Sequence, residues 1–244
     1  MYDESQVKEF IRRLPEIDPG TVHLEMLACR SRFSKQVLGV KIKDLVLERK
    51  ITRAIPNWRE RYFSTVHNLS LLQGDGLYVF REGVRIPNHA LVIYSTISPR
   101  SIKSAIKDVM TLNVDNLVNL KLEELGKVGT QWFSALHRHR DKSFISTTID
   151  IDVLDSGLLS LIMDEVSSIT MFMVTETSRG YHVILNLTRS EDAEAFYHGT
   201  HGIIHGIRLK YGKNVEIQRD SQEPTPGTMY YREGKPNHLI TIIR

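Results

Sequence analysis

The segment FISTTIDIDV, residues 144–153, is an apolar, β-branched run that carries two carboxylates. Asp150 and Asp152 stand at positions i and i+2. On a β-strand this spacing places both carboxylates on one face, while Ile149 and Ile151 point to the other. The segment therefore predicts a strand with an acidic face and an apolar face.

Downstream of this strand, helical and strand-like patterns alternate. The predicted elements are a helix over Leu158–Val166, strands over Thr170–Thr175 and Tyr181–Leu187, a helix from Asp192 to about Tyr211 and a strand over Asn214–Gln218. Together with the strand at 144–153, they follow the order βαββαβ. This is the order of a ferredoxin-like or RNA-recognition-motif-like (RRM-like) sheet with its helices on one face.

Upstream, the sequence predicts a second module of helices and strands. Its predicted elements are a helix over Ser5–Leu14, a hairpin formed by the strand-like run 77–80 between turns at 74–76 and 82–83, a strand over Ala90–Ile97, a helix that starts at Ser98-Pro99 and a helical region over Val114–Leu125. We expect an α/β (α+β) protein with an N-terminal αβ module at 1–142 and a C-terminal RRM-like module at 143–244. A cleft is expected between them.

The composition is that of a globular protein. With 244 residues, 41% hydrophobic and 25% charged, the chain does not match disordered, collagen-like or coiled-coil sequences. The single cysteine, Cys29, excludes an internal disulfide and an all-cysteine metal site. The N-terminus does not match a signal peptide, and no run approaches the roughly 20 apolar residues of a membrane span. We expect a cytoplasmic protein without membrane contact.

Basic residues are concentrated in one part of the chain, although the formal net charge is only +3. Residues 30–61 combine Lys and Arg with interleaved aromatic side chains, which suits phosphate contact and base stacking. A solvated basic face with ordinary core aromatics is the alternative. The candidates for nucleic-acid contact are Arg30, Arg32 and Lys35, together with Arg100 and Lys103 at the start of a predicted helix.

The paired carboxylates indicate a divalent cation. Two adjacent carboxylates on a sheet repel each other, and hard oxygen ligands suit Mg²⁺ or Mn²⁺ bridging to phosphates. Solvent-facing or capping aspartates are the alternative for Asp150 and Asp152. The turn Ser178-Arg179-Gly180-Tyr181-His182 lies between two predicted strands, and in a βαββαβ sheet the third strand neighbours the first. His182 is therefore expected beside Asp150, unless it is an ordinary, partly buried histidine.

Taken together, these motifs resemble the archaeo-eukaryotic primase superfamily, in its phage or plasmid type. Ile149-Asp150-Ile151-Asp152 matches the family's Asp-x-Asp strand, and 178–182 matches its Ser-x-His-type motif with one residue fewer before the arginine. The third acid is less clear: Asp220 is our choice and Glu216 the alternate. Pro226-Gly227-Thr228 resembles the turn that follows this acid in the family.

The resemblance implies a template-dependent nucleotidyltransferase that joins nucleotides on a DNA template by two-metal catalysis. Asp150, Asp152 and the third acid would hold two Mg²⁺ or Mn²⁺ ions. Ser178, Arg179, His182 and Lys235 would bind the nucleoside triphosphate, and the basic N-terminal region would hold the template. A helicase domain or a second subunit is a possible partner, and the host cytoplasm is the expected location.

Other functions remain open from the sequence. A metal-dependent nuclease, or another phosphotransferase with an Asp-x-Asp motif, could use the same residues. A non-catalytic RRM-like binding module is the third option, although an acidic sheet face repels phosphate unless a metal intervenes.

Two histidine clusters also need an interpretation. His198, His201 and His205 share one helical face, but without an obvious fourth ligand zinc is not expected. The stretch 137–142 is either a solvated basic connector or a nucleotide-facing patch.

Overall fold

The computed structural model describes residues 2–30, 45–74, 76–79, 83, 85–141, 144–169, 171–186, 193–219, 222–232 and 235–244; the side chains of 193–201, 219, 231–232 and 235–238 are not described. The chain combines helices with sheets whose strand pairs are all antiparallel in this part of the chain. The mixed α/β class predicted from the sequence is confirmed.

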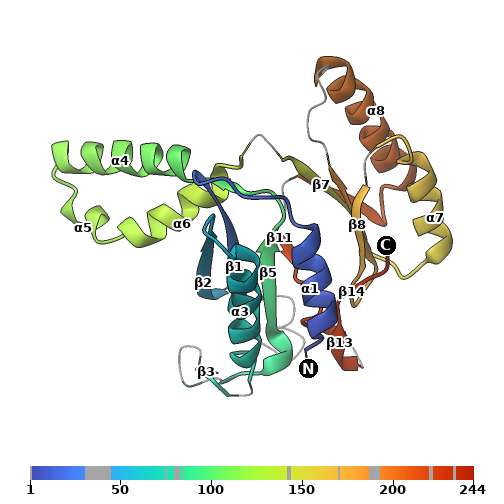
Figure 1. Ribbon diagram of the computed structural model, residues 1–244, viewed down its shortest axis with the longest axis horizontal. Coiled ribbons are helices and arrows are strands. Elements are labelled where there is room, and N and C mark those ends of the chain that lie inside the picture. Colours follow the sequence, from blue (N-terminus) through green and yellow to red (C-terminus); the bar gives the residue numbers. More distant parts are fainter. Residues whose placement is uncertain are drawn as a thin grey trace.

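The C-terminal sheet carries the predicted motifs. Its elements follow in the order β7 (Ser146–Ile151), α7 (Ser156–Glu165), β8 (Met171–Glu176), β9 (Tyr181–Asn186), α8 (Ala193–Tyr211) and β10 (Val215–Arg219). The strands are arranged β10-β7-β9-β8, with β14 (Thr241–Ile242) at the edge. The βαββαβ succession is confirmed, and β9 pairs with β7. Both α7 and α8 lie on the same side of this sheet (Figure 1).

The apolar face of β7 explains why the helices lie on one side of this sheet. Ile149 and Ile151 are fully buried in a core shared with Ile162 of α7 and Ile207 of α8. Because strand side chains alternate, the carboxylate of Asp150 lies on the face away from these helices. The helices thus leave the acidic face open to the rest of the molecule.

The N-terminal sheet faces this acidic side. It contains β1 (Thr21–Cys29), β2 (Leu45–Arg53), β5 (Leu91–Thr96), β6 (Arg100–Ser101) and β11 (Gln222–Pro224). The strand order is β11-β5-β1-β2, and β6 pairs with β1. Since β11 follows β10 in the chain, the segment after residue 219 returns to the N-terminal sheet. The proposed division at residue 143 remains a prediction, and strands from both sides of it share one sheet.

Helices α1 (Glu4–Arg13) and α3 (Trp58–Leu71) help to join the two sheets. Phe10 of α1 and Tyr62 of α3 are buried in one core with Met173 of β8 and Ile184 of β9. The predicted first helix is confirmed: Asp3 caps it by accepting hydrogen bonds from the backbone N–H groups of residues 5 and 6. This shared core fixes the two sheets relative to each other.

Smaller elements complete the body. The predicted hairpin is confirmed as β3 (Tyr78–Val79) paired with β4 (Arg85–Ile86). A short 3₁₀ helix, η2 (Asn88–Ala90), precedes β5. Near the C-terminus, β12 (Met229–Arg232) pairs with β13 (Lys235–Leu239). Within the described residues, none of the helices combines the length and the apolar composition needed to cross a membrane.

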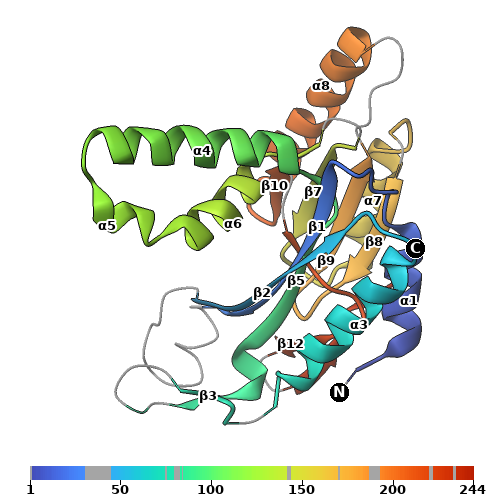
Figure 2. The same cartoon turned by 60° about the vertical axis from the view of Figure 1, so that its left-hand side comes forward.

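A helical arm projects from the body (Figure 2). It consists of α4 (Ile102–Val118), α5 (Leu122–Leu125) and α6 (Val128–Arg138). The predicted helix start at Ser98 was wrong, because β6 intervenes and Ser101 is the N-cap, accepting from the Ser104 backbone N–H. The predicted helix over Val114–Leu125 was also wrong: α4 continues to Val118, and Leu120 at φ 53° separates it from α5.

Candidate functional site

A cleft of about 300 Å³ lies between the acidic face of the C-terminal sheet and the N-terminal sheet. Its lining combines acids, bases and aromatic rings from both sheets: Met26, Ala28, Arg30, Val46, Tyr94, Asp150, Asp152, Thr177, Arg179, His182, Glu216, Gln218, Gln222, Pro224 and Tyr230. Strands far apart in the sequence therefore build one polar opening.

Three carboxylates line the cleft. Asp150 on β7 pairs in register with Glu216 on β10, and Asp152 follows directly after the end of β7. Burial is the main cause that raises the pKa of Asp150 above its usual value; His182 lowers it, and the neighbouring carboxylates raise it further. The side-chain amide of Gln218 donates a hydrogen bond of 2.9 Å to Asp150 Oδ2.

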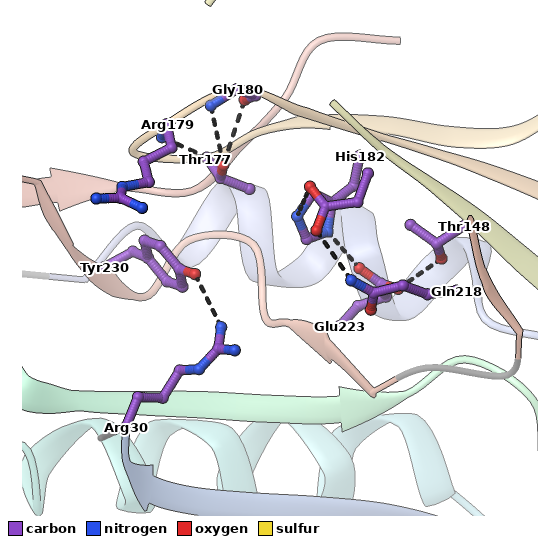
Figure 3. A network of polar contacts seen from close by, with 10 residues as sticks. Arg30, Thr148, Thr177, Arg179, Gly180, His182, Gln218, Glu223 and Tyr230 are labelled. Carbon is purple, nitrogen blue, oxygen red and sulfur yellow. Dashed lines mark hydrogen bonds and ion pairs between the residues drawn. The ribbon is translucent and has the colours of Figure 1, made fainter. Parts of the chain in front are cut away.

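His182 on β9 lies directly opposite Asp150, as the predicted strand order requires. Its ring is nearly buried between two acids: Nδ1 is 2.6 Å from Glu223 Oε2, and Nε2 is 3.4 Å from Asp150 Oδ1 (Figure 3). Burial lowers the pKa of His182, but the attraction of Glu223 and its hydrogen bond outweigh that effect, so the pKa is raised. The surroundings favour the charged form of the ring.

Glu223 was not singled out from the sequence. It lies on β11 and is 2% exposed, and its Oε1 accepts a hydrogen bond of 2.5 Å from Thr148 on β7. Both carboxylate oxygens thus have partners on the C-terminal sheet, although β11 belongs to the N-terminal sheet. The only sequence feature that marks Glu223 is its place just before the Pro-Gly-Thr turn. That feature does not indicate its contact with His182, which is 41 residues away in the sequence.

The turn between β8 and β9 closes tightly over the end of β7. The backbone N–H of Thr177 donates to the Gly180 carbonyl, and the Thr177 hydroxyl contacts the backbone of Gly180. A Cβ on Gly180 would lie 1.7 Å from the carbonyl oxygen of Ile151, so this position requires glycine. Gly180 thereby sets the position of its neighbour Arg179.

The residues of this turn divide into two groups. Thr177 and Arg179 line the cleft. Ser178, the predicted phosphate contact, is buried and does not line it, and its Oγ has no hydrogen-bond partner among the described residues. Thr177 thus lines the cleft in place of Ser178, while its hydroxyl bonds to the backbone within the turn.

The opposite wall of the cleft is basic and aromatic. Arg30, just after β1, donates a hydrogen bond of 3.3 Å to the hydroxyl of Tyr230 (Figure 3). Its guanidinium also lies 5.7 Å from the centre of the Tyr94 ring. The structure thus sets a cation across the cleft from the carboxylates of β7.

Other predicted nucleic-acid contacts lie elsewhere. The prediction that Arg100 contacts a template was wrong. Its side chain is only 1% exposed and donates a hydrogen bond to the His137 carbonyl in the interior. Lys103 is exposed at the base of the arm. Arg32 and Lys35 lie outside the described residues.

The remaining candidate residues are only partly described. Asp220 lies outside the described residues, as does the side chain of Lys235, whose backbone belongs to β13. Of the three helical histidines, only His205 has a described side chain, and it is exposed. In the 137–142 stretch, His139 Nε2 is 2.6 Å from Asp108 Oδ2 on the arm.

The carboxylates of the cleft are candidate ligands for a divalent ion. In the part of the chain that the structure describes, no group of three or more His, Cys, Asp or Glu side chains forms a complete metal site. Asp150 and Asp152 nevertheless supply hard oxygen donors to one opening. Burial is the largest cause of the raised pKa of Asp150, and the neighbouring carboxylates add to it, a repulsion that a cation would relieve. Carboxylate oxygens of this kind are chemically suited to Mg²⁺ or Mn²⁺.

Comparison of the chain with protein-family models, with curated proteins and with solved structures gave no match.

Proposed function

We propose that this protein is a template-dependent nucleotidyltransferase of primase or primase-polymerase type. The observation that carries the proposal is the cleft in which Asp150 and Asp152 share an opening with Arg179, His182 and Arg30. Carboxylates that suit cations and basic side chains that suit phosphates lie together there. Nucleotidyl transfer needs this combination, because the reacting phosphate is anionic and its leaving group is pyrophosphate.

The arrangement of the C-terminal sheet supports the RRM-like part of the proposal. The order β10-β7-β9-β8 corresponds to the fourth, first, third and second strands of a βαββαβ unit, with every pair antiparallel. The acids lie on the central strand β7 (Asp150), just after its end (Asp152) and on the neighbouring edge strand β10 (Glu216). In an RNA-binding RRM this face carries aromatic rings that stack on bases, so the acids favour catalysis over simple binding.

In the proposed site, Asp150 and Asp152 would hold the divalent ions, with Glu216 or Asp220 as the third acid. Bound ions would activate the attacking 3′-hydroxyl and neutralise charge on the leaving pyrophosphate. Arg179 and His182 would bind phosphate oxygens of the incoming nucleoside triphosphate, since both line the cleft and carry groups that can be cationic. Glu223 would hold His182 in place through Nδ1.

Arg30 and the two tyrosines on the opposite wall would bind the nucleotide base or the template. An arginine over an aromatic ring is a surface on which a base can stack, and its charge can contact backbone phosphate without reading sequence.

The test is an extension assay with labelled nucleotides, Mg²⁺ or Mn²⁺, and primed and unprimed DNA templates. We expect template-directed incorporation by the wild type and a loss of more than about 100-fold for Asp150→Asn and Asp152→Asn, because these changes remove the charge that binds the ions. Asp164→Asn, an exposed aspartate on α7, is the control that keeps activity.

A parallel incubation with DNA and metal but no nucleotides separates the alternatives. Shortening of the DNA would indicate a nuclease. A protein that neither incorporates nucleotides nor cleaves DNA would be a binding module if the wild type and the aspartate variants bind DNA equally well. Either result would overturn the proposal.

A further inference from the structure

The last turn of α6 borders the cleft. Nε2 of His137 on this helix lies 3.3 Å from Met26 Sδ, and the side-chain nitrogen of Gln222 lies 3.0 Å from its Nδ1. Met26 and Gln222 both line the cleft. Because α6 runs from the tip of the arm back to the body (Figures 1 and 2), its surface continues from the cleft toward the arm.

An aromatic ring and a cation lie together on this surface. Phe133 stands four residues before His137, so the two side chains share one face of α6. The Phe133 ring is half-buried, and the guanidinium of Arg49 on β2 lies 5.6 Å from its centre. One helical turn is about 5.4 Å, so this pair lies a short step beyond His137.

The strand register places Arg49 on the side of the N-terminal sheet that faces the cleft. Arg49 pairs with Met26, and Arg53 pairs with Val22. Directly opposite residues of an antiparallel pair project to the same face, so both arginines share the face to which Met26 belongs. Both are exposed, and neither forms an ion pair within the described ranges.

The neighbouring groups leave this positive charge available to a ligand. Asp108 on the arm already contacts two bases, with its Oδ2 2.6 Å from His139 Nε2 and 3.4 Å from Arg138. Burial lowers the pKa of His137 to about 4, and the charges of Arg100 and Arg49 add to this effect. At neutral pH the His137 ring is therefore uncharged, and the arginines carry the charge beside the cleft.

We propose that Arg49 and Phe133 bind single-stranded DNA that extends out of the cleft. An unpaired base would stack on the ring or on the guanidinium, and Arg49 and Arg53 would contact phosphates. Cations alone would suit any polyanion, but a ring beside a cation favours unpaired bases, because the bases of a duplex are already stacked. That the bound strand is the template rests on the proposed function.

The first test measures binding of a labelled oligothymidylate of about 16 nucleotides by fluorescence anisotropy, without metal or nucleotides. We expect the wild type to bind it. Phe133→Leu is expected to weaken binding about fivefold or more, because leucine keeps the apolar packing and removes the stacking surface. The matched control is Phe63→Leu on α3, since Phe63 is also half-buried and Lys8 Nζ lies 5.2 Å from its ring centre.

The second test separates charge from stacking through the salt dependence of binding. Arg49→Gln is expected to reduce the slope of log affinity against log salt by about 0.7, the contribution of one phosphate contact in a single strand. Phe133→Leu should leave this slope unchanged. The matched control is Lys50→Gln: Lys50 is the exposed neighbour on β2, and its pairing with Glu25 places it on the opposite face.

Two outcomes would overturn the proposal. One is a wild type that does not bind the oligonucleotide, which would leave the two arginines of β2 to an acidic protein. The other is equal behaviour of each site variant and its control, that is, of Phe133→Leu and Phe63→Leu or of Arg49→Gln and Lys50→Gln.

The failure of this proposal is distinguishable from the failure of the proposed function. The binding assay contains neither metal nor nucleotide, so a protein that binds the strand through Arg49 and Phe133 but extends no primer contradicts the proposed function alone. Conversely, primer extension at limiting template that is as fast for Arg49→Gln and Phe133→Leu as for the wild type contradicts the second contact alone.

Discussion

Nδ1 of His182 lies 2.6 Å from the carboxylate of Glu223, and this contact joins β9 of one sheet to β11 of the other. His182 lines the cleft, with Glu223 on one side of its imidazole ring and Asp150 on the other. The position of the histidine therefore depends on the packing of both sheets.

Replacing Glu223 by alanine is expected to destabilise the protein by about 3 kcal/mol, because it leaves His182 and Thr148 without their buried partner. Urea denaturation measures the free energy of unfolding. Glu216→Ala, at an exposed position that also lines the cleft, is the control and should change this free energy by less than about 0.5 kcal/mol. Equal effects of the two variants would show that the His182–Glu223 pair contributes little.

Gly180→Ala is expected to destabilise the protein strongly, because the added methyl group would overlap the backbone of Ile151 at the end of β7. We expect a loss of about 3 kcal/mol or more, measured as a fall in the thermal midpoint. Gly202→Ala on α8 is the matched control, since nothing lies within 4 Å of the new Cβ. There, alanine should raise stability by about 0.5–1 kcal/mol. Similar midpoints for both variants would contradict the close contact.

The stability of the protein is expected to fall as the pH drops from about 6.5 to about 4, partly because of His23. This residue is fully buried against Trp58 and Tyr62, and burial lowers its pKa to about 4. Between the two pKa values the unfolded chain binds a proton that the folded protein excludes, so acid favours unfolding.

The pKa of His23 is near 6.5 in the unfolded chain and about 4 in the folded protein. This difference corresponds to a loss of up to about 3 kcal/mol in the free energy of unfolding. Urea unfolding at pH 7 and pH 4.5 checks it by comparing the wild type with His23→Gln. The variant should lose less stability between the two pH values. The same loss in both proteins would assign the acid sensitivity to other groups.

If the cleft binds nucleoside triphosphates, Arg179→Ala and Arg30→Ala should each weaken that binding by about tenfold, because Arg179 would contact the phosphates and Arg30 would stack on the base. Fluorescence anisotropy with a labelled, non-hydrolysable triphosphate and Mg²⁺ measures the affinity. Arg208→Ala on the exposed side of α8 is the control. Unchanged affinity in both cleft variants would argue against this binding mode.

Much of the C-terminal sheet could be predicted, because its elements have strong local patterns. The alternation in 144–153 separated Ile149 and Ile151 from the two aspartates, and the βαββαβ order placed His182 beside Asp150. The strand β1 was missed although polar and apolar residues alternate over Thr21–Met26. All nine of its residues are buried, so its polar side chains Thr21, His23 and Glu25 do not mark a solvent-facing side.

Some errors came from local signals that tertiary contacts overrode. Ser98-Pro99 is a typical helix start, but the Ser98 hydroxyl forms a hydrogen bond with the Ser146 hydroxyl in the interior. Ser101 is the N-cap of α4 instead. Arg100 was expected to contact a template because it stands at the start of the predicted helix. It is buried instead, and it donates a hydrogen bond to the His137 carbonyl of α6.

The sequence alone determined which residues of 144–218 form strands and helices, and that Asp150 and His182 are neighbours. These features follow from side-chain periodicity and from the strand order of a βαββαβ unit. Only the tertiary structure decided that β11 returns to the first sheet, that Glu223 holds His182, and that Arg30 faces the acids. The physical reason is that these contacts join segments tens to hundreds of residues apart, and the packing of two sheets around a shared core fixes them.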